Sequence, residues 1–181
     1  MTKYLDTLIK DVLEHSESKV WSNAVNEWEV VDVREDRNLS SMCICGKEGL
    51  RYLFRIRNSI NNNTLFPIGS RCIKKFERND LNMLVDVKEK LFVLFHALQS
   101  AEYITLDSTY FSRNLIEYLY DEGVFAPTRY NKYDGINDYE FLLDMFNQRK
   151  EPNSNQQGKI NGIIAYSIIP YLQKELSERI I

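Results

Sequence analysis

Three cysteines within thirty residues are the part of this sequence best suited to chemistry. They occur in Cys43-Ile44-Cys45-Gly46 and Gly69-Ser70-Arg71-Cys72, and the chain has no others. An odd number of cysteines argues against a closed disulfide framework. Glycine-containing turns let backbone N–H groups point at thiolates, as zinc sites require. The spacing therefore predicts that Cys43, Cys45 and Cys72 bind one metal ion, with structural Zn²⁺ as the expected cofactor.

The fourth ligand of such a site is left open by the sequence. The chain has two histidines, His15 and His96, and both fall in predicted helices. The candidates are these two side chains, Asp32, Asp36 and a water molecule. The alternative interpretation is a metal-free hairpin with two buried thiols, which pack as small apolar residues.

The cysteine segment is also a basic island in an acidic chain. Residues 43–78 hold eight Lys/Arg against two Asp/Glu, a net charge of +6, whereas the whole chain carries −3. Such a cluster could contact phosphates or the carboxylates of an acidic protein. The alternative is that it pairs with acidic groups of the same chain. The cations predicted to bind nucleic acid or a partner are Arg51, Arg55, Arg57, Arg71, Lys74, Lys75 and Arg78.

The hydrophobic pattern predicts an α+β protein whose elements frame these residues. Residues 3–15 read as a helix, 27–34 and 51–57 as strands, and 65–68 as a return strand that Pro67 suits to a sheet edge. Helical periodicity dominates from Leu81 onward, with a helix capped at Asp107 or Ser108 and a last helix interrupted near Pro170. We expect an α+β module over 1–80 and a helical domain over 81–181, unless the two form one continuous body.

Composition narrows the function classes. At 44% hydrophobic residues, with seven Gly and four Pro in 181 residues, the chain has material for a folded core. No signal peptide or membrane span is expected, which predicts a cytoplasmic protein. Neither histidine has a triad-like setting, and no His-x-Glu motif precedes the cysteines as in zinc deaminases. The sequence therefore predicts a protein that is not an enzyme.

The segments CICGK, LRYLFRIRN and PIGSRCIKKF, between Trp28 and Phe76, resemble small zinc-motif proteins of phages and mobile elements of Gram-positive bacteria. Some of these look like anti-CRISPR proteins, which inhibit the type II RNA-guided nuclease. Related-looking sequences carry a polar residue, sometimes a histidine, where this chain has Asn58. The resemblance thus adds Asn58 to the candidate metal ligands.

Together these observations predict a binding protein in a bacterial host cell that engages a nucleoprotein through a zinc-clamped basic hairpin. If the resemblance holds, the partner is a type II CRISPR effector with its guide RNA, and the effect is inhibition. The alternative is a DNA-binding regulator of phage or mobile-element origin that contacts DNA or RNA directly. A metal-dependent enzyme is the third reading. The tyrosine-rich helices could also support a homodimer.

Overall fold

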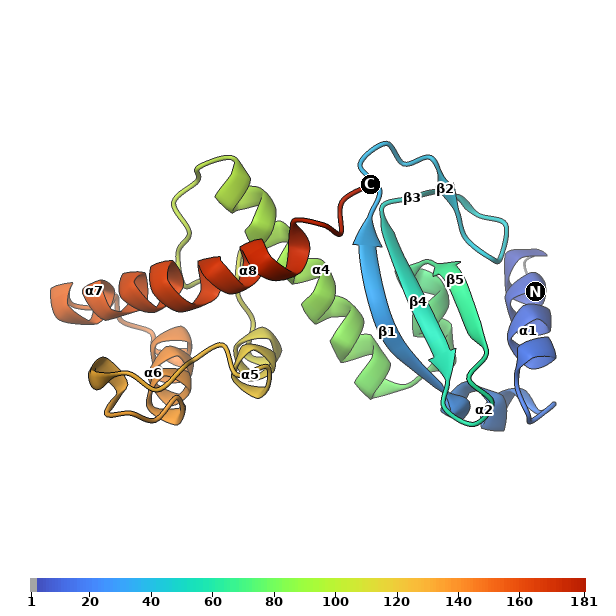
Figure 1. The fold of residues 1–181 in the computed structure, drawn as a ribbon, viewed down its shortest axis with the longest axis horizontal. Coiled ribbons are helices and arrows are strands. Elements are labelled where there is room, and N and C mark those ends of the chain that lie inside the picture. The colour runs from blue at the N-terminus through green and yellow to red at the C-terminus, as the bar shows by residue number, and fades with distance from the viewer. Residues whose placement is uncertain (1–2) are drawn as a thin grey trace. The chain divides into compact units, whose positions relative to one another are not determined.

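The computed structural model describes residues 3–181 and confirms the α+β class (Figure 1). The chain divides into two compact units. The sheet unit comprises the residues up to Asp86 together with Arg179–Ile181, and the helical unit comprises Val87–Glu178. The division falls within one long helix rather than in a linker. Among residues 3–181, no helix combines the length and apolar composition that a membrane span needs.

The sheet unit contains one three-stranded and one two-stranded antiparallel sheet, ordered β1-β4-β5 and β2-β3. Its strands are β1 (Trp28–Glu35), β2 (Ser41–Met42), β3 (Glu48–Leu50), β4 (Tyr52–Asn58) and β5 (Thr64–Ile68). Its helices are α1 (Lys3–His15), α2 (Trp21–Ala24), the 3₁₀ turns η1 (Val25–Glu27) and η2 (Lys74–Phe76), α3 (Ser70–Ile73) and the start of α4 (Asn79–Gln99).

Strand β4 lies at the centre of the larger sheet, and β5 takes the edge position that Pro67 favours. The predicted alternation along β4 is visible in its burial: Phe54 and Ile56 are buried, while Arg57 is exposed. Leu53 points the other way and is buried as well, so both faces are covered near this end of the strand. The strand thus carries core packing along its length and leaves its charged side chains at the surface.

Buried polar groups connect the Asn58 end of β4 to the chain before β1. The Glu27 carboxylate accepts hydrogen bonds from the backbone N–H groups of Glu17 (2.8 Å) and Ser18 (2.7 Å) and from Asn58 Nδ2 (2.6 Å). The Asn58 Oδ1 accepts from the N–H of Ile60 at 2.8 Å, which shapes the turn into β5. Charge-assisted bonds of this kind are the strong ones in a protein interior. One carboxylate therefore joins the end of the first helix, the start of β1 and the hairpin.

The other end of β1 pairs with the last residues of the chain. The N–H of Glu35 donates to the carbonyl of Arg179 at 2.8 Å, and the N–H of Ile181 donates back to the carbonyl of Glu35 at 2.8 Å. The Glu35 side chain is fully buried and accepts from Arg51 Nε at 2.8 Å. Arg51 is thereby tied to β1.

The helical unit holds the rest of α4 and α5 (Arg113–Asp121), η3 (Arg129–Asn131), α6 (Ile136–Asn147), α7 (Ser154–Ile163), the π-helical turn η4 (Ile164–Ile168) and α8 (Ile169–Leu176). The prediction that Asp107 or Ser108 caps α5 is wrong. Ser112 is the cap, and its Oγ accepts from the N–H of Leu115 at 3.1 Å. Pro170 stands at the start of α8, where its missing N–H is tolerated.

We expect Glu27→Gln to lower the free energy of unfolding by about 2 kcal/mol, because a neutral amide turns one N–H toward donors that need an acceptor. The matched control is Glu29→Gln. Glu29 pairs with Arg57 at 2.6 Å but its side chain is 47% exposed, so this change should cost less than about 1 kcal/mol. Urea unfolding of both variants checks the prediction, and equal losses would contradict it.

The pH dependence of the same group gives a second readout. Burial alone would raise the pKa of Glu27, but the hydrogen bonds from Asn58, Ser18 and Glu17 outweigh it and lower the pKa. A carboxyl with a lowered folded pKa stabilises the protein above its unfolded pKa of about 4.3 and loses that contribution as the pH falls below it. The acid-side loss of stability should therefore be smaller in Glu27→Gln than in the parent.

Candidate metal centre

The structure brings the three cysteine sulfurs together. The Sγ atoms of Cys43 and Cys72 are 3.6 Å apart, those of Cys45 and Cys72 are 3.4 Å apart, and all three lie within 4.8 Å of one another. Cys43 and Cys45 are buried, while Cys72 is partly exposed. In the part of the chain that the structure describes, this is the one cluster of three or more His, Cys, Asp or Glu ligand atoms. The predicted convergence of these residues is thus a feature of the fold.

Two glycine-containing turns position the sulfurs. In the first, Gly46 adopts a φ of +89°, a conformation that favours glycine, and the N–H of Cys43 donates to the carbonyl of Lys47 at 2.8 Å. In the second, a Cβ on Gly69 would come within 2.9 Å of a methyl group of Leu50. The N–H of Gly69 donates to Cys43 Sγ at 3.3 Å. Gly46 thus shapes the first turn, and in the second a glycine N–H contacts a cysteine sulfur directly.

The donor set fits a thiophilic metal ion. In a tetrahedral zinc–thiolate site with Zn–S bonds of about 2.3 Å, the sulfurs are about 3.8 Å apart. The separations of 3.4 and 3.6 Å are close to this value. Thiolates select soft or borderline cations over calcium and magnesium. Cys43, Cys45 and Cys72 could therefore hold a metal ion and would join the two turns through it.

The thiols affect one another's ionisation. The sulfur–sulfur hydrogen bond with Cys72, together with the N–H groups of Cys45 and Gly69, lowers the pKa of Cys43 to about 5 despite burial. The pKa of Cys45 is raised, chiefly by burial. The pKa of Cys72 is raised beyond the usual thiol range, first by its hydrogen bond to Cys43 and then by burial. Mutual repulsion thus limits ionisation in the absence of a cation, which a bound metal would relieve.

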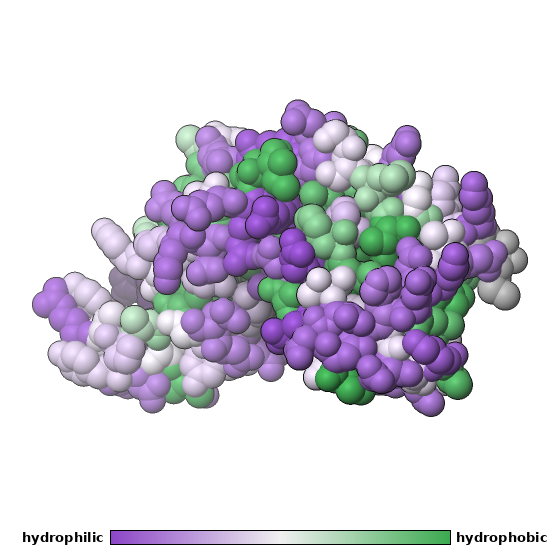
Figure 2. All heavy atoms as spheres, turned by 45° about the vertical axis from the view of Figure 1, so that its right-hand side comes forward, coloured by the Kyte–Doolittle hydropathy of each residue, from purple (hydrophilic) through white to green (hydrophobic). Residues whose placement is uncertain are grey.

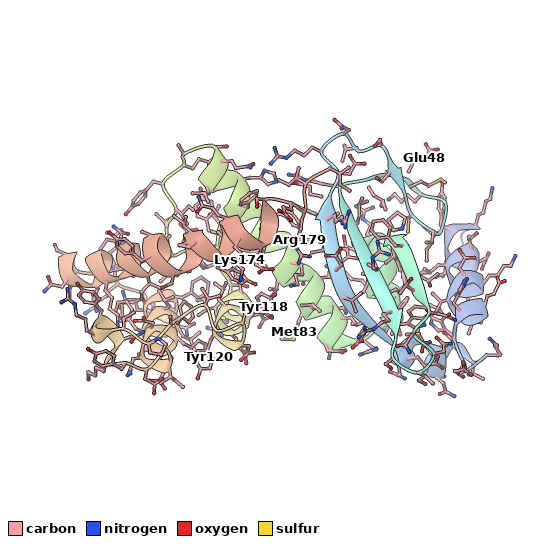
Figure 3. The ribbon with its side chains drawn as sticks, in the orientation of Figure 1. Glu48, Met83, Tyr118, Tyr120, Lys174 and Arg179 are labelled. Atoms are coloured by element: carbon pink, nitrogen blue, oxygen red, sulfur yellow. The ribbon has the colours of Figure 1, made fainter. Side chains whose placement is uncertain are left out.

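None of the candidate fourth ligands joins the cluster. Asn58 stands at the far end of β4 from Tyr52, which lines the sulfur site, and its amide bonds to Glu27. The Asp32 carboxylate pairs with Arg179, which lies beside β1 in Figure 3. His96 belongs to the helical unit and His15 ends α1.

Asp36 has a structural role of its own near the first cysteine turn. Its carboxylate accepts hydrogen bonds from Asn38, Ser40 and Ser41, including both serine hydroxyls. These bonds, above all the one from Ser41, lower the pKa of Asp36 to about 2. The carboxylate thereby orders the loop that leads into Cys43.

The predicted cations divide into two groups. Four of the seven form ion pairs with carboxylates of the sheet unit: Arg51 with Glu35, Arg57 with Glu29, Lys74 with Asp86 and Arg78 with Asp80. Arg55 lies over the Phe66 ring at 4.3 Å. Among the described residues, Arg71 and Lys75 make no ion pair, and both are exposed. The basic island is therefore partly neutralised within the chain.

Cations also surround the sulfur site. A hollow of about 240 Å³ beside the three cysteines is lined by Lys47, Arg51 and Arg71, and we call these three residues the cationic rim. Figure 2 shows a largely hydrophilic face with apolar side chains in small separate groups. Sequence reasoning missed Lys47. Its position directly after the Cys45-Gly46 turn was the available signal.

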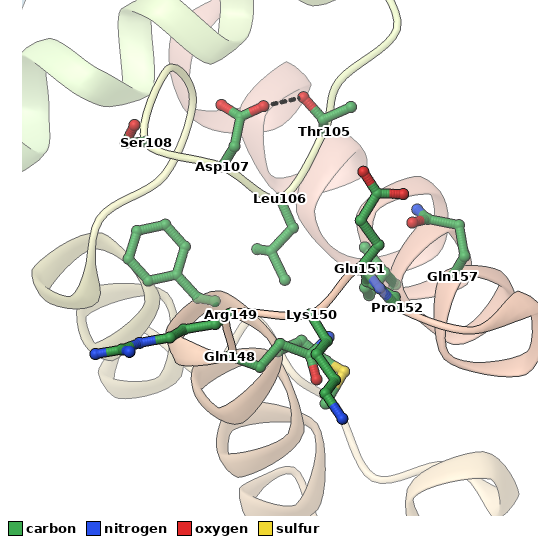
Figure 4. A pocket seen from close by; sticks show the side chains of 13 residues that line it. Thr105, Leu106, Asp107, Ser108, Gln148, Arg149, Lys150, Glu151, Pro152 and Gln157 are labelled. Atoms are coloured by element: carbon green, nitrogen blue, oxygen red, sulfur yellow. Dashed lines mark hydrogen bonds between the residues drawn. The ribbon is translucent and has the colours of Figure 1, made fainter.

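The helical unit has a different hollow, of about 590 Å³, between the loop at Thr105–Ser108 and the segment before α7. In Figure 4 the Asp107 carboxylate accepts a hydrogen bond from Thr105, while the Arg149 and Lys150 side chains point away from it. Its charged groups do not converge on one point, as a catalytic constellation requires.

Comparison with known proteins returned no matching family model, no matching curated protein and no matching solved structure.

The thiol arrangement predicts a titration in the metal-free protein. Below pH 5 the Cys43 thiol should be protonated, and above it a single thiolate per chain should form, because its pKa is about 5. The ultraviolet absorbance of thiolate, followed against pH, measures this step. Cys43→Ser should abolish it, whereas Cys45→Ser should retain a low-pH step. A parent protein whose first thiolate forms only above neutral pH would contradict the arrangement.

Proposed function

We propose that this chain is a non-enzymatic binding protein that holds Zn²⁺ at Cys43, Cys45 and Cys72 and engages a nucleoprotein through the cationic surface next to it. The observation that carries the proposal is the three-sulfur cluster bordered by the cationic rim. A zinc ion there would supply structural cross-linking of the two turns. The turns would then present Arg71 and Lys47 from a rigid base.

Zinc is favoured over other ions by the ligand type. The donors are three cysteine sulfurs, two of them buried. Zn²⁺ binds cysteine thiolates and is almost always tetrahedral in structural sites. The fourth donor in this proposal is water or a group from outside the chain, because the described His, Asp and Glu side chains lie outside the cluster.

An anionic target is supported by the cations that the chain does not neutralise. Arg71 and Lys75 are four residues apart in the α3–η2 segment, so they share a face and could contact adjacent phosphates. The sequence resemblance makes a type II CRISPR effector with its guide RNA the first target to test. Direct DNA binding, as by a regulator, is the alternative.

We expect one zinc per chain in purified protein, measured by elemental analysis, and a lower melting temperature after chelation. When free zinc exceeds the dissociation constant by about 1,000-fold, binding stabilises the fold by about 4 kcal/mol. Cys72→Ser should lose the metal, while His96→Gln should keep it. Magnesium added after chelation should not restore the melting temperature, since this ion prefers oxygen ligands. Absence of zinc from the purified protein would contradict the site, and so would retention of zinc by Cys72→Ser.

The binding surface is tested by Arg71→Glu combined with Lys75→Glu. Neither residue pairs with a carboxylate, so the fold should keep its stability, and binding to the effector–guide complex should weaken at least about tenfold through charge repulsion. The matched control is Lys132→Glu with Lys150→Glu, two exposed cations of the helical unit. Arg51 is left unchanged because its guanidinium pairs with the buried Glu35 carboxylate, so its replacement could also change the stability of the fold.

Pull-down with the effector–guide complex and electrophoretic shifts with DNA alone separate the two targets. A complex with the effector and no shift with DNA supports inhibition of a nucleoprotein. A shift with DNA alone that the Arg71/Lys75 double variant abolishes would replace this target by DNA. Unaltered effector binding by the double variant would remove the cationic surface from the proposal.

A further inference from the structure

The helical unit contains a hollow of about 670 Å³ that neither the metal centre nor the basic surface uses. It is bordered by the turn at Thr128–Tyr130, by Asp138 of α6 and by successive turns of α7 and η4. In Figure 1, α7 and α8 follow each other along one axis through the η4 turn. Pockets that bury small ligands commonly have volumes of about 300–1,000 Å³.

Two glycines in α7 line this hollow, and nothing in the chain requires them. A Cβ on Gly158 or Gly162 would meet no atom within 4 Å, and neither residue has a φ in the left-handed region. Alanine stabilises a helix interior more than glycine does. Neither backbone conformation nor packing within the chain therefore explains the glycines. What they provide is space along one side of the hollow.

Aromatic rings stand at the same hollow with most of their surface in water. Tyr166 is 86% exposed and Tyr130 is 73% exposed. Tyr166 lies in the π-helical turn, whose Ile164 and Ile168 are buried, so the turn faces the core and presents the tyrosine outward. Single π-helical turns are frequent at functional sites. The rings offer flat apolar faces on which a planar group could stack.

Cations are held at the border by groups of the chain. The Arg129 guanidinium lies 4.7 Å above the Tyr130 ring. Lys159 Nζ is 3.2 Å from Oδ1 of Asp138, which is only 6% exposed, and lies over the Phe141 ring at 4.3 Å. A stacked guanidinium and an ammonium fixed by a buried carboxylate can both meet an anion.

We propose that this hollow binds a free mononucleotide, with the base stacked on Tyr166 and Tyr130 and the phosphate at Arg129 and Lys159. Stacking on an aromatic side chain is favourable for every base, because each base has a flat π-face. The helical unit, residues 87–178, has nine Lys/Arg and thirteen Asp/Glu, a net charge of −4. This excess of acid disfavours a long polyanion and favours a small ligand that meets only the local cations.

Titration calorimetry and saturation-transfer NMR with AMP, GMP, CMP and UMP test the proposal on the full chain. At least one of these nucleotides should bind, and its nucleoside should bind at least about tenfold more weakly because it lacks the phosphate. Gly162→Leu should weaken binding by at least about tenfold by filling the space, while its melting temperature stays equal or rises. That combination separates loss of binding from loss of folding.

Tyr166→Ala should weaken nucleotide binding by at least about tenfold through lost stacking. Tyr103→Ala is the matched control: Tyr103 is 66% exposed in the same unit but does not line this hollow. Absence of binding by all four nucleotides, or full binding by Gly162→Leu, would overturn the proposal. Binding of an oligothymidylate without binding of any mononucleotide would also overturn the proposal. If light scattering shows that the parent is a dimer and that Gly162→Leu is a monomer, the glycines would instead provide the contact with a second copy of the chain.

Discussion

The hydrogen bond between the buried Glu27 carboxylate and Asn58 is the contact on which the sheet unit depends. A carboxylate taken out of water is stable only when its oxygens are fully engaged, and this one accepts from two adjacent backbone N–H groups after α1 and from the Asn58 amide at the end of β4. The bond therefore sets where β4 begins its turn relative to β1. Strand β4 runs from Tyr52, beside the sulfur site, to this turn, so the sulfur site and the Glu27–Asn58 bond lie at opposite ends of one strand.

Folding of the sheet unit pairs several cations of the hairpin with carboxylates. Antiparallel pairing sets Arg57 opposite Glu29, and the two side chains form an ion pair; Arg51, Lys74 and Arg78 also pair with carboxylates of the sheet unit, so much of the positive charge counted along the sequence is neutralised within it. Surface pairs of this type contribute little to stability. They do keep the arginines in defined positions. Among the described residues of the basic island, the cations without an ion pair include Lys47 in the first cysteine turn and Arg71 and Lys75 in the α3–η2 segment, and these segments also carry or adjoin the cysteines.

The spacing of apolar residues along the sequence was enough to predict several of the helices and strands. The helix at Lys3–His15, the strand at Tyr52–Asn58 and the edge strand with Pro67 followed from spacing and from what proline forbids. The convergence of Cys43, Cys45 and Cys72 followed from their glycine turns. The start of α5 did not, because Asp107, Ser108 and Ser112 are all residue types that cap helices and their spacing does not select among them; Ser112 is the cap. Nor could the role of Asn58 be foreseen, since it depends on a carboxylate thirty-one residues away.

The return of Arg179–Ile181 to β1 has a consequence for how the molecule is assembled. Arg179 and Asp32 pair across 147 residues of sequence, and the entropy lost in closing a loop grows with the length of flexible chain between its ends. A folded helical unit replaces most of that flexible chain by a fixed body, which makes closure easier. During synthesis, moreover, these residues follow the whole of Val87–Glu178. The parallel pairing at Glu35 can therefore form only after all of Val87–Glu178 has been synthesised, so the residues that complete the sheet unit follow the helical unit in the chain.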